Sequence, residues 1–169
     1  MLKRVLMLAL LGFGQTAFAA EEGEAAAQQT FGDWAQRCEK SADNKESCFI
    51  FQSVTRKETS QLILNVRIGY GQKTGDQPLM ILTVPTGVLL PAGAAFMMEG
   101  IEPVKLKYLT CTAQACVTMA QPLPAETVDG MKKKVEASVR IADPNQQVVG
   151  MPVSLKGFTK ALASLTPPN

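Results

Sequence analysis

Short apolar runs separated by turn residues make up most of the chain after residue 30. In the clearest run, Leu64, Val66 and Ile68 alternate with Asn65 and Arg67, which is the period of two of a half-buried β-strand. Runs of this kind occupy residues 31–38, 48–55, 62–70, 79–84, 94–98, 104–111, 116–120, 135–141 and 147–153. Many short strands spaced by Gly and Pro predict a mainly β fold, either a β-sandwich or a small β-barrel.

The spacing becomes helical near the end of the chain. Apolar residues recur there at intervals of three or four: Leu155, Phe158, Leu162 and Leu165. We expect a C-terminal helix over residues 154–165, with Ser154 as its N-cap and Phe158 as its deepest anchor. Residues 124–132 predict a second short helix that ends at Gly130. One or two short peripheral helices should therefore pack on the β domain.

The uncharged stretch 79–98 has the length that a membrane span needs. The turn sequences Pro-Thr-Gly at 85–87 and Pro-Ala-Gly at 91–93 interrupt it, which favours two buried strands joined by a bend. Its methionines, Met80, Met97 and Met98, carry thioethers that suit copper. Without histidine or a regular methionine spacing, core filling is the favoured role.

The first 19 residues have the three parts of a bacterial secretory signal peptide. Lys3 and Arg4 precede a nine-residue apolar core at 5–13, and Ala-Phe-Ala at 17–19 offers a cleavage site. The core is too short to cross a hydrocarbon layer of about 30 Å. We expect a signal peptide at 1–19, a flexible leader at 20–30 and a single domain at 31–166, with no transmembrane segment after cleavage.

Four cysteines enter an oxidising compartment if the chain is exported: Cys38, Cys48, Cys111 and Cys116. Three connectivities are possible. The local pairs Cys38–Cys48 and Cys111–Cys116 are favoured, because each pair is close in sequence and the second flanks a hairpin-like turn. The spacings match thioredoxin-like and zinc sites poorly. The cysteines therefore predict structural disulfides, with no metal and no cofactor.

Charge and the missing histidine exclude several classes of function. Loss of Lys3 and Arg4 leaves 15 basic and 15 acidic residues, so the surplus that nucleic-acid binding requires is absent. The single basic run, the lysines at 132–134, is interpreted as a solvated turn. Without histidine there is no Ser-His-Asp or Cys-His catalysis and no imidazole ligand, and the acidic residues show no paired arrangement. We expect a protein without enzymatic activity and without a nucleic-acid partner.

Four motifs in a fixed order resemble the invasion-associated locus B family of exported bacterial proteins. They are FGDWAQRCE at 31–39 with Cys48 following, VPTGVLLPAGAAFMMEG at 84–100, CTAQAC at 111–116 and MPVSLKGFTKAL at 151–162. The resemblance covers about residues 31–165. It implies a small disulfide-containing domain of the bacterial envelope, from a family named for a part in host-cell invasion. It implies no catalytic residues.

Two classes of function are compatible with these features. The first is a binding module in the periplasm, on the outer envelope or secreted, whose partner is an envelope or host protein. Its contact surface would be a sheet face or an exposed edge strand. The second is a carrier of a small molecule or lipid, which needs a cavity between the sheets lined by residues 79–98. The sequence names neither the partner nor the oligomeric state.

Overall fold

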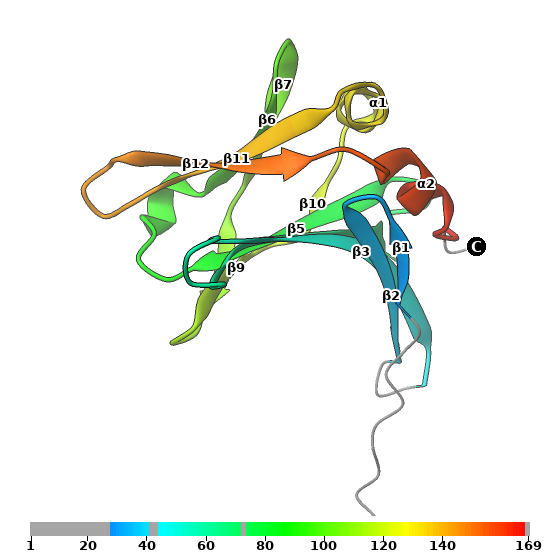
Figure 1. Cartoon of the computed structure of the whole chain (residues 1–169), viewed down its shortest axis with the longest axis horizontal. Helices are drawn as coiled ribbons and strands as arrows, with labels where there is room; N and C mark the ends of the chain where they lie inside the picture. The colour runs from blue at the N-terminus through cyan, green and yellow to red at the C-terminus, as the bar shows by residue number, and fades with distance from the viewer. Residues whose placement is uncertain (1–27, 41–43, 72–73, 168–169) are drawn as a thin grey trace, which may run out of the picture.

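The computed structural model of the chain describes residues 28–40, 44–71 and 74–167. Two β-sheets pack face to face, and two short helices lie at one end of the space between them (Figure 1). The mainly β class predicted from the sequence is confirmed. Because the strands form two separate sheets, the β-sandwich is the right one of the two predicted architectures.

The larger sheet has eight strands. Five consecutive strands are antiparallel neighbours: β1 (Gln29–Phe31), β2 (Trp34–Lys40), β3 (Glu46–Thr55), β4 (Leu62–Tyr70) and β5 (Pro78–Pro85). Beyond β5 the sheet continues with β9 (Ala115–Thr118) and then β8 (Tyr108–Cys111), while the short β10 (Gln121–Pro122) also pairs with β5.

The smaller sheet has four strands in the order β12-β11-β6-β7. These are β6 (Ala94–Met98), β7 (Ile101–Leu106), β11 (Glu136–Ala142) and β12 (Val148–Ser154). A 3-10 turn, η1 (Leu90–Ala92), connects β5 to β6. The chain changes sheets between β5 and β6 and again at Lys107 between β7 and β8.

Two of the predicted runs each contain two strands. Residues 31–38 are divided by Gly32, whose φ of +62° allows a tight turn between β1 and β2. Residues 104–111 are divided at Lys107, where the chain leaves one sheet for the other. A pattern of apolar residues cannot detect a turn within it, so both runs were predicted too long.

The predicted helices are present with different limits. The C-terminal helix, α2 (Phe158–Ala163), begins after Gly157, and Ser154 is not its N-cap because Ser154 is the last residue of β12. The other helix, α1 (Ala125–Lys133), does not end at Gly130. A Cβ there would collide with Ile101 of β7, so the glycine permits close packing of helix on strand. The lysines predicted as a solvated turn at 132–134 are exposed at Lys132 and Lys133, but these two residues form the last turn of α1.

One hydrophobic core fills the space between the two sheets and the helices. Phe158 is fully buried, and its ring meets that of Trp34 edge-on at 5.3 Å between centroids. The stretch 79–98 forms β5, η1 and β6, as predicted. Met80 and Met98 point into the core, but Met97 points to the opposite face of β6 and is partly exposed. Core filling was therefore correct for two of the three methionines.

The limits of the domain differ slightly from the prediction. β1 begins at Gln29, within the expected leader, because Gln29 and Thr30 pair with β2. The predicted signal peptide and residues 20–27 lie outside the described residues. In the part of the chain that the structure describes, no helix has the length and apolar character to cross a membrane.

Candidate functional site

Two of the sequence motifs, FGDW at 31–34 and SLKGF at 154–158, pack against each other and are joined by hydrogen bonds at one edge of the sandwich. The amide of Asp33 donates to the carbonyl of Lys156 at 3.1 Å, and the Ser154 hydroxyl donates to the Asp33 carboxylate at 2.6 Å. At Gly157 (φ +89°) the backbone passes so close to Phe31 that a Cβ would collide with its carbonyl group. These two segments, more than 120 residues apart, therefore hold each other in a fixed position.

Gln52 joins the two sheets below this junction. Its side-chain amide donates to the carbonyls of Ser154 (2.9 Å) and Asp33 (3.1 Å), and its carbonyl accepts from the Ser154 amide at 2.9 Å. The indole of Trp34 donates to the same Ser154 carbonyl at 2.9 Å. Gln52 was not predicted from the sequence. The available signal was a lone polar residue at an inward position of β3, between Ile50 and Val54.

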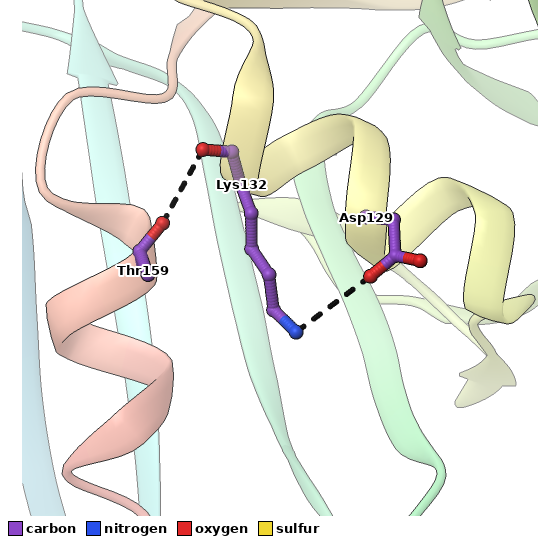
Figure 2. A network of polar contacts seen from close by, with 3 residues as sticks. All are labelled: Asp129, Lys132 and Thr159. Atoms are coloured by element: carbon purple, nitrogen blue, oxygen red, sulfur yellow. Dashed lines mark hydrogen bonds and ion pairs between the residues drawn. The ribbon is translucent and has the colours of Figure 1, made fainter.

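A groove of about 630 Å³ lies beside the junction. It is lined by β1 with the glycine after it, by α1, and by α2 with the segment that leads into it. The lining residues are Thr30, Phe31, Gly32, Lys132, Leu155, Lys156, Gly157, Thr159 and Lys160. We call it the lysine groove, because its charged lining residues are the three lysines. Figure 2 shows the hydrogen bond that joins α2 to α1 along its wall, and the neighbouring ion pair within α1. The Thr159 hydroxyl of α2 donates to the Lys132 carbonyl of α1 at 3.4 Å, and the Lys132 amine lies 3.8 Å from Asp129.

The outer face of the larger sheet carries a second candidate surface. Its arginine guanidiniums stack on phenylalanine rings: Arg67 lies 3.9 Å from the centroid of Phe49, and Arg37 lies 5.3 Å from that of Phe51. Leu79 and Ile81 continue the surface on β5 and line a small hollow of about 180 Å³ with Phe49 and Arg67. We call the set Arg37, Phe49, Phe51, Arg67, Leu79 and Ile81 the arginine–phenylalanine face.

Strand pairing explains how this face is built. Side chains alternate along each strand, so Phe49 and Phe51, on either side of inward Ile50, point outward. Arg67, next to inward Ile68, points outward for the same reason. Phe49 stands opposite Gly69, which has no side chain, and this leaves its ring free for Arg67. No helix or strand among the described residues covers the face (Figure 1). Phe49 is nevertheless only 7% exposed, which we attribute to the arginine stacked on it.

One disulfide borders the arginine–phenylalanine face, since Cys48 lines the same hollow as Phe49 and Arg67, and the other lies at the β8–β9 turn. Cys38 and Cys48 face each other across β2 and β3 with their Cα atoms 3.9 Å apart. Cys111 and Cys116 face each other across β8 and β9 at 4.0 Å. The pairs in the structure are those expected from the sequence.

The titratable groups do not gather into a reactive cluster among the described residues. One set of potential metal ligands lies close enough to share an ion, Cys38, Cys48 and Glu46, but both sulfurs belong to a disulfide and cannot act as thiolates. Burial raises the pKa of Tyr108 to about 12, and burial followed by the charge of Asp76 raises the pKa of Tyr70. Both tyrosines stay neutral at physiological pH, so neither is poised as a base.

The side chains expected to line a carrier's cavity between the sheets are packed into the hydrophobic core. Of the inward side chains of the stretch 79–98, four are at most 1% exposed (Met80, Leu82, Val84 and Phe96), Ala94 is 3% and Met98 7% exposed, and all belong to the common core. The grooves described above open on the outside of the sandwich. These features define the class: a small, two-disulfide β-sandwich with a packed interior and its distinctive chemistry on the surface.

Comparisons with known proteins place this class in a family. The family model described as Invasion associated locus B (IalB) protein matches residues 34–166. The chain therefore belongs to the invasion associated locus B family, as its four motifs indicated. The crystal structure of invasion associated protein B from Bartonella henselae is similar, with a TM-score of 0.71 and 18% identity over 82% of this chain and 93% of that chain. This likeness shows a shared fold. No curated protein sequence matches the chain.

Proposed function

We propose that this chain is an exported, non-enzymatic protein of the bacterial envelope that binds a protein partner through the arginine–phenylalanine face. The observation that carries the proposal is the stacking of Arg37 and Arg67 on two phenylalanines of an uncovered sheet face. Arginine and aromatic residues are enriched at the energetic centres of protein interfaces, and stacking holds the guanidiniums in place before a partner arrives. Disulfides and membership of an envelope-associated family support the location.

Capture of partners from crosslinked envelopes tests this proposal. The variant Arg37→Glu with Arg67→Glu reverses both charges on the face. The matched control is Arg56→Glu with Arg140→Glu, which makes the same change at two exposed residues outside it. We expect the same partner to be recovered with the wild type and the control and lost with the face variant. Equal recovery with all three proteins, at unchanged melting temperature, would remove the face from the proposal.

The carrier function remains the alternative from the sequence, and native mass spectrometry separates the two. A binding module should be detected at the mass of the polypeptide alone after gentle purification. A stoichiometric small molecule or lipid retained by the wild type would favour the carrier. The family's name also raises a role in contact with host cells, which belongs to the proposal. Comparing host-cell invasion by the wild type, a deletion strain and the complemented deletion strain tests it.

A further inference from the structure

The lysine groove concentrates positive charge on a part of the surface that the arginine–phenylalanine face does not use. Its three lysines come from different segments: Lys132 from α1, Lys156 from the loop before α2, and Lys160 from α2. The groove is lined by no carboxylate. Among the described residues, Lys156 and Lys160 form no ion pair, and Lys132 has one with Asp129, in which both side chains are largely exposed (42% and 61%). Such an exposed pair is weak.

The scaffold under these amines is rigid. Gly32 and Gly157 cross with their backbones in contact, and the amide of Asp33 donates to the Lys156 carbonyl. The Asp33 carboxylate accepts the Ser154 hydroxyl at 2.6 Å, within the junction. The bond from Thr159 to the Lys132 carbonyl joins α2 to α1. The backbones that carry the three lysines are thus held in place, which lowers the entropy that a ligand must overcome to engage them.

The geometry selects the kind of anion. An arginine fork binds one compact phosphate or carboxylate group through two parallel hydrogen bonds, whereas each lysine acts as a separate point charge, and no arginine lines this groove. Ammonium groups on long stems around a broad, open groove fit several separate negative charges instead. The floor at Gly32 and Gly157 has no side chains, so a polypeptide backbone can approach it closely.

We propose that the lysine groove binds an extended, acidic segment of a partner polypeptide, whose carboxylates face Lys132, Lys156 and Lys160. This inference deepens the proposed binding function and rests on it, since it names the chemistry of a partner. It concerns residues other than the arginine–phenylalanine face. The two proposals can therefore fail separately.

Fluorescence anisotropy on the whole mature chain tests the groove, with a labelled peptide of alternating Glu and Ser as the probe and its Gln-Ser counterpart as the neutral reference. The variant Lys156→Gln with Lys160→Gln removes two amines from the groove. Lys105→Gln with Lys107→Gln removes two exposed amines elsewhere and is the matched control. We expect the acidic peptide to bind the wild type and the control alike, about tenfold or more weakly to the groove variant, and less tightly as salt rises to about 0.3 M.

Three outcomes would overturn the proposal. Equal binding by the groove variant and the wild type would place the peptide elsewhere. Equal weakening by the control variant would show a general effect of charge. Binding of pyrophosphate or of vesicles containing anionic phospholipid, lost in the groove variant while the acidic peptide does not bind, would assign the groove to phosphate-bearing ligands. In the partner capture described above, a partner recovered by the wild type together with failure of the peptide to bind would leave the proposed function intact and reject the groove alone.

Discussion

At the scale of single residues, buried polar side chains form hydrogen bonds with backbone amides and carbonyls that have no partner on a neighbouring strand. Gln52 satisfies both the amide and the carbonyl of Ser154 at the end of β12, where no further strand is available. Thr118 of β9 has a similar role beside β5, since its hydroxyl accepts a hydrogen bond from the amide of Leu82 at 2.9 Å. A buried amide without a partner costs about 1–3 kcal/mol, so these two polar residues belong to the structural framework of the sandwich.

Replacing Phe158 should destabilise the protein strongly. Its ring is fully buried against Trp34, and Phe158→Ala should lower the free energy of unfolding by roughly 3 kcal/mol. Urea unfolding followed by fluorescence of Trp34, the chain's single tryptophan, measures the change. Val148→Ala, at a side chain that is 66% exposed, is the control and should shift stability by less than about 0.5 kcal/mol. An unchanged transition for Phe158→Ala would contradict the docking of α2.

Tyr108 should make the protein sensitive to alkali. Its hydroxyl is buried without a hydrogen-bond partner among the described residues, and burial raises its pKa to about 12 from the ordinary 10.0. Because the folded-state pKa is the higher one, the unfolded chain loses this proton first. The contribution of Tyr108 to stability is therefore complete below pH 10 and is lost as the pH rises toward 12.

The measurement is the urea midpoint between neutral pH and pH 12 for the wild type and Tyr108→Phe. The variant should be at least as stable as the wild type at neutral pH, because it removes an unsatisfied hydroxyl. It should also show a smaller alkaline loss, with the remainder coming from groups such as Tyr70, whose pKa is raised as well. Identical alkaline curves for the two proteins would show that Tyr108 does not titrate in this way.

At the scale of elements, glycines decide where segments begin, end and approach one another. Gly32 makes the turn that separates β1 from β2, and Gly157 precedes α2 in a left-handed conformation. Gly130 lies within a helix and brings α1 against Ile101. These contacts fix the lysine groove, because two of the three glycines lie in or next to its floor.

Alanine at Gly157 should disrupt the junction, whereas alanine at Gly75 should not. Both glycines have positive φ, +89° and +55° respectively, so each substitution carries the backbone cost of about 1 kcal/mol. Only at Gly157 would the new Cβ collide with the backbone of β1, while at Gly75 nothing lies within 4 Å. Thermal unfolding should show a much larger loss for Gly157→Ala. A similar small loss for both would mean that the two segments are not locked together.

The two disulfides should each stabilise a hairpin. By the loop-entropy estimate, Cys111–Cys116 contributes about 2 kcal/mol and Cys38–Cys48 somewhat under 3 kcal/mol. Serine at both positions of a pair should reduce the free energy of unfolding by about these amounts, and peptide mapping without reduction should recover the two local pairs. Recovery of Cys38 joined to Cys111 or Cys116, or of free thiols throughout, would contradict the register of β2 with β3 and of β8 with β9.

At the scale of the whole molecule, the sandwich separates stability from recognition. The core uses the inward face of each sheet, one side of each helix and Cys116 of one disulfide. The arginine–phenylalanine face and the lysine groove lie on the outside and share no residue. Charge substitutions at the exposed Lys156 and Lys160 should therefore change binding while leaving the unfolding transition nearly unchanged.

The purified protein should show no turnover in broad hydrolase and thiol-exchange assays. The chain has no histidine, and its cysteines are paired in the structure. Deletion of the gene should instead alter the composition of the envelope, which proteomic profiling of the deletion and complemented strains measures. A turnover that survives stringent purification and is abolished by one point mutation would overturn the non-enzymatic assignment.

Most of the fold could be predicted because its determinants are local. The alternation at 62–70 places Leu64, Val66 and Ile68 in the core as expected, and the helical spacing after residue 154 correctly indicates buried Phe158 and Leu162. The candidate surfaces could not be predicted in this way. Arg67 reaches Phe49 across a strand pair, and Lys132 joins Lys156 and Lys160 only when α1 packs beside α2.

The sequence by itself determined the β class, the short strands and the terminal helix, because periodicity and turn residues act within a few residues of the chain. It also indicated the family, through four motifs in a fixed order. Tertiary structure alone decided that β1 pairs with β2 from Gln29, that Ser154 ends a strand instead of capping a helix, and that Gln52 reaches it from the other sheet. Of these three outcomes, the contact of Gln52 with Ser154 joins segments about 100 residues apart, whereas β1 pairs with its chain neighbour β2 and Ser154 pairs with Glu136 of β11. No local pattern records which distant backbone a residue will meet, so the lysine groove exists only once α1 and α2 have packed beside β1, and the arginine–phenylalanine face only once β2 to β5 have paired.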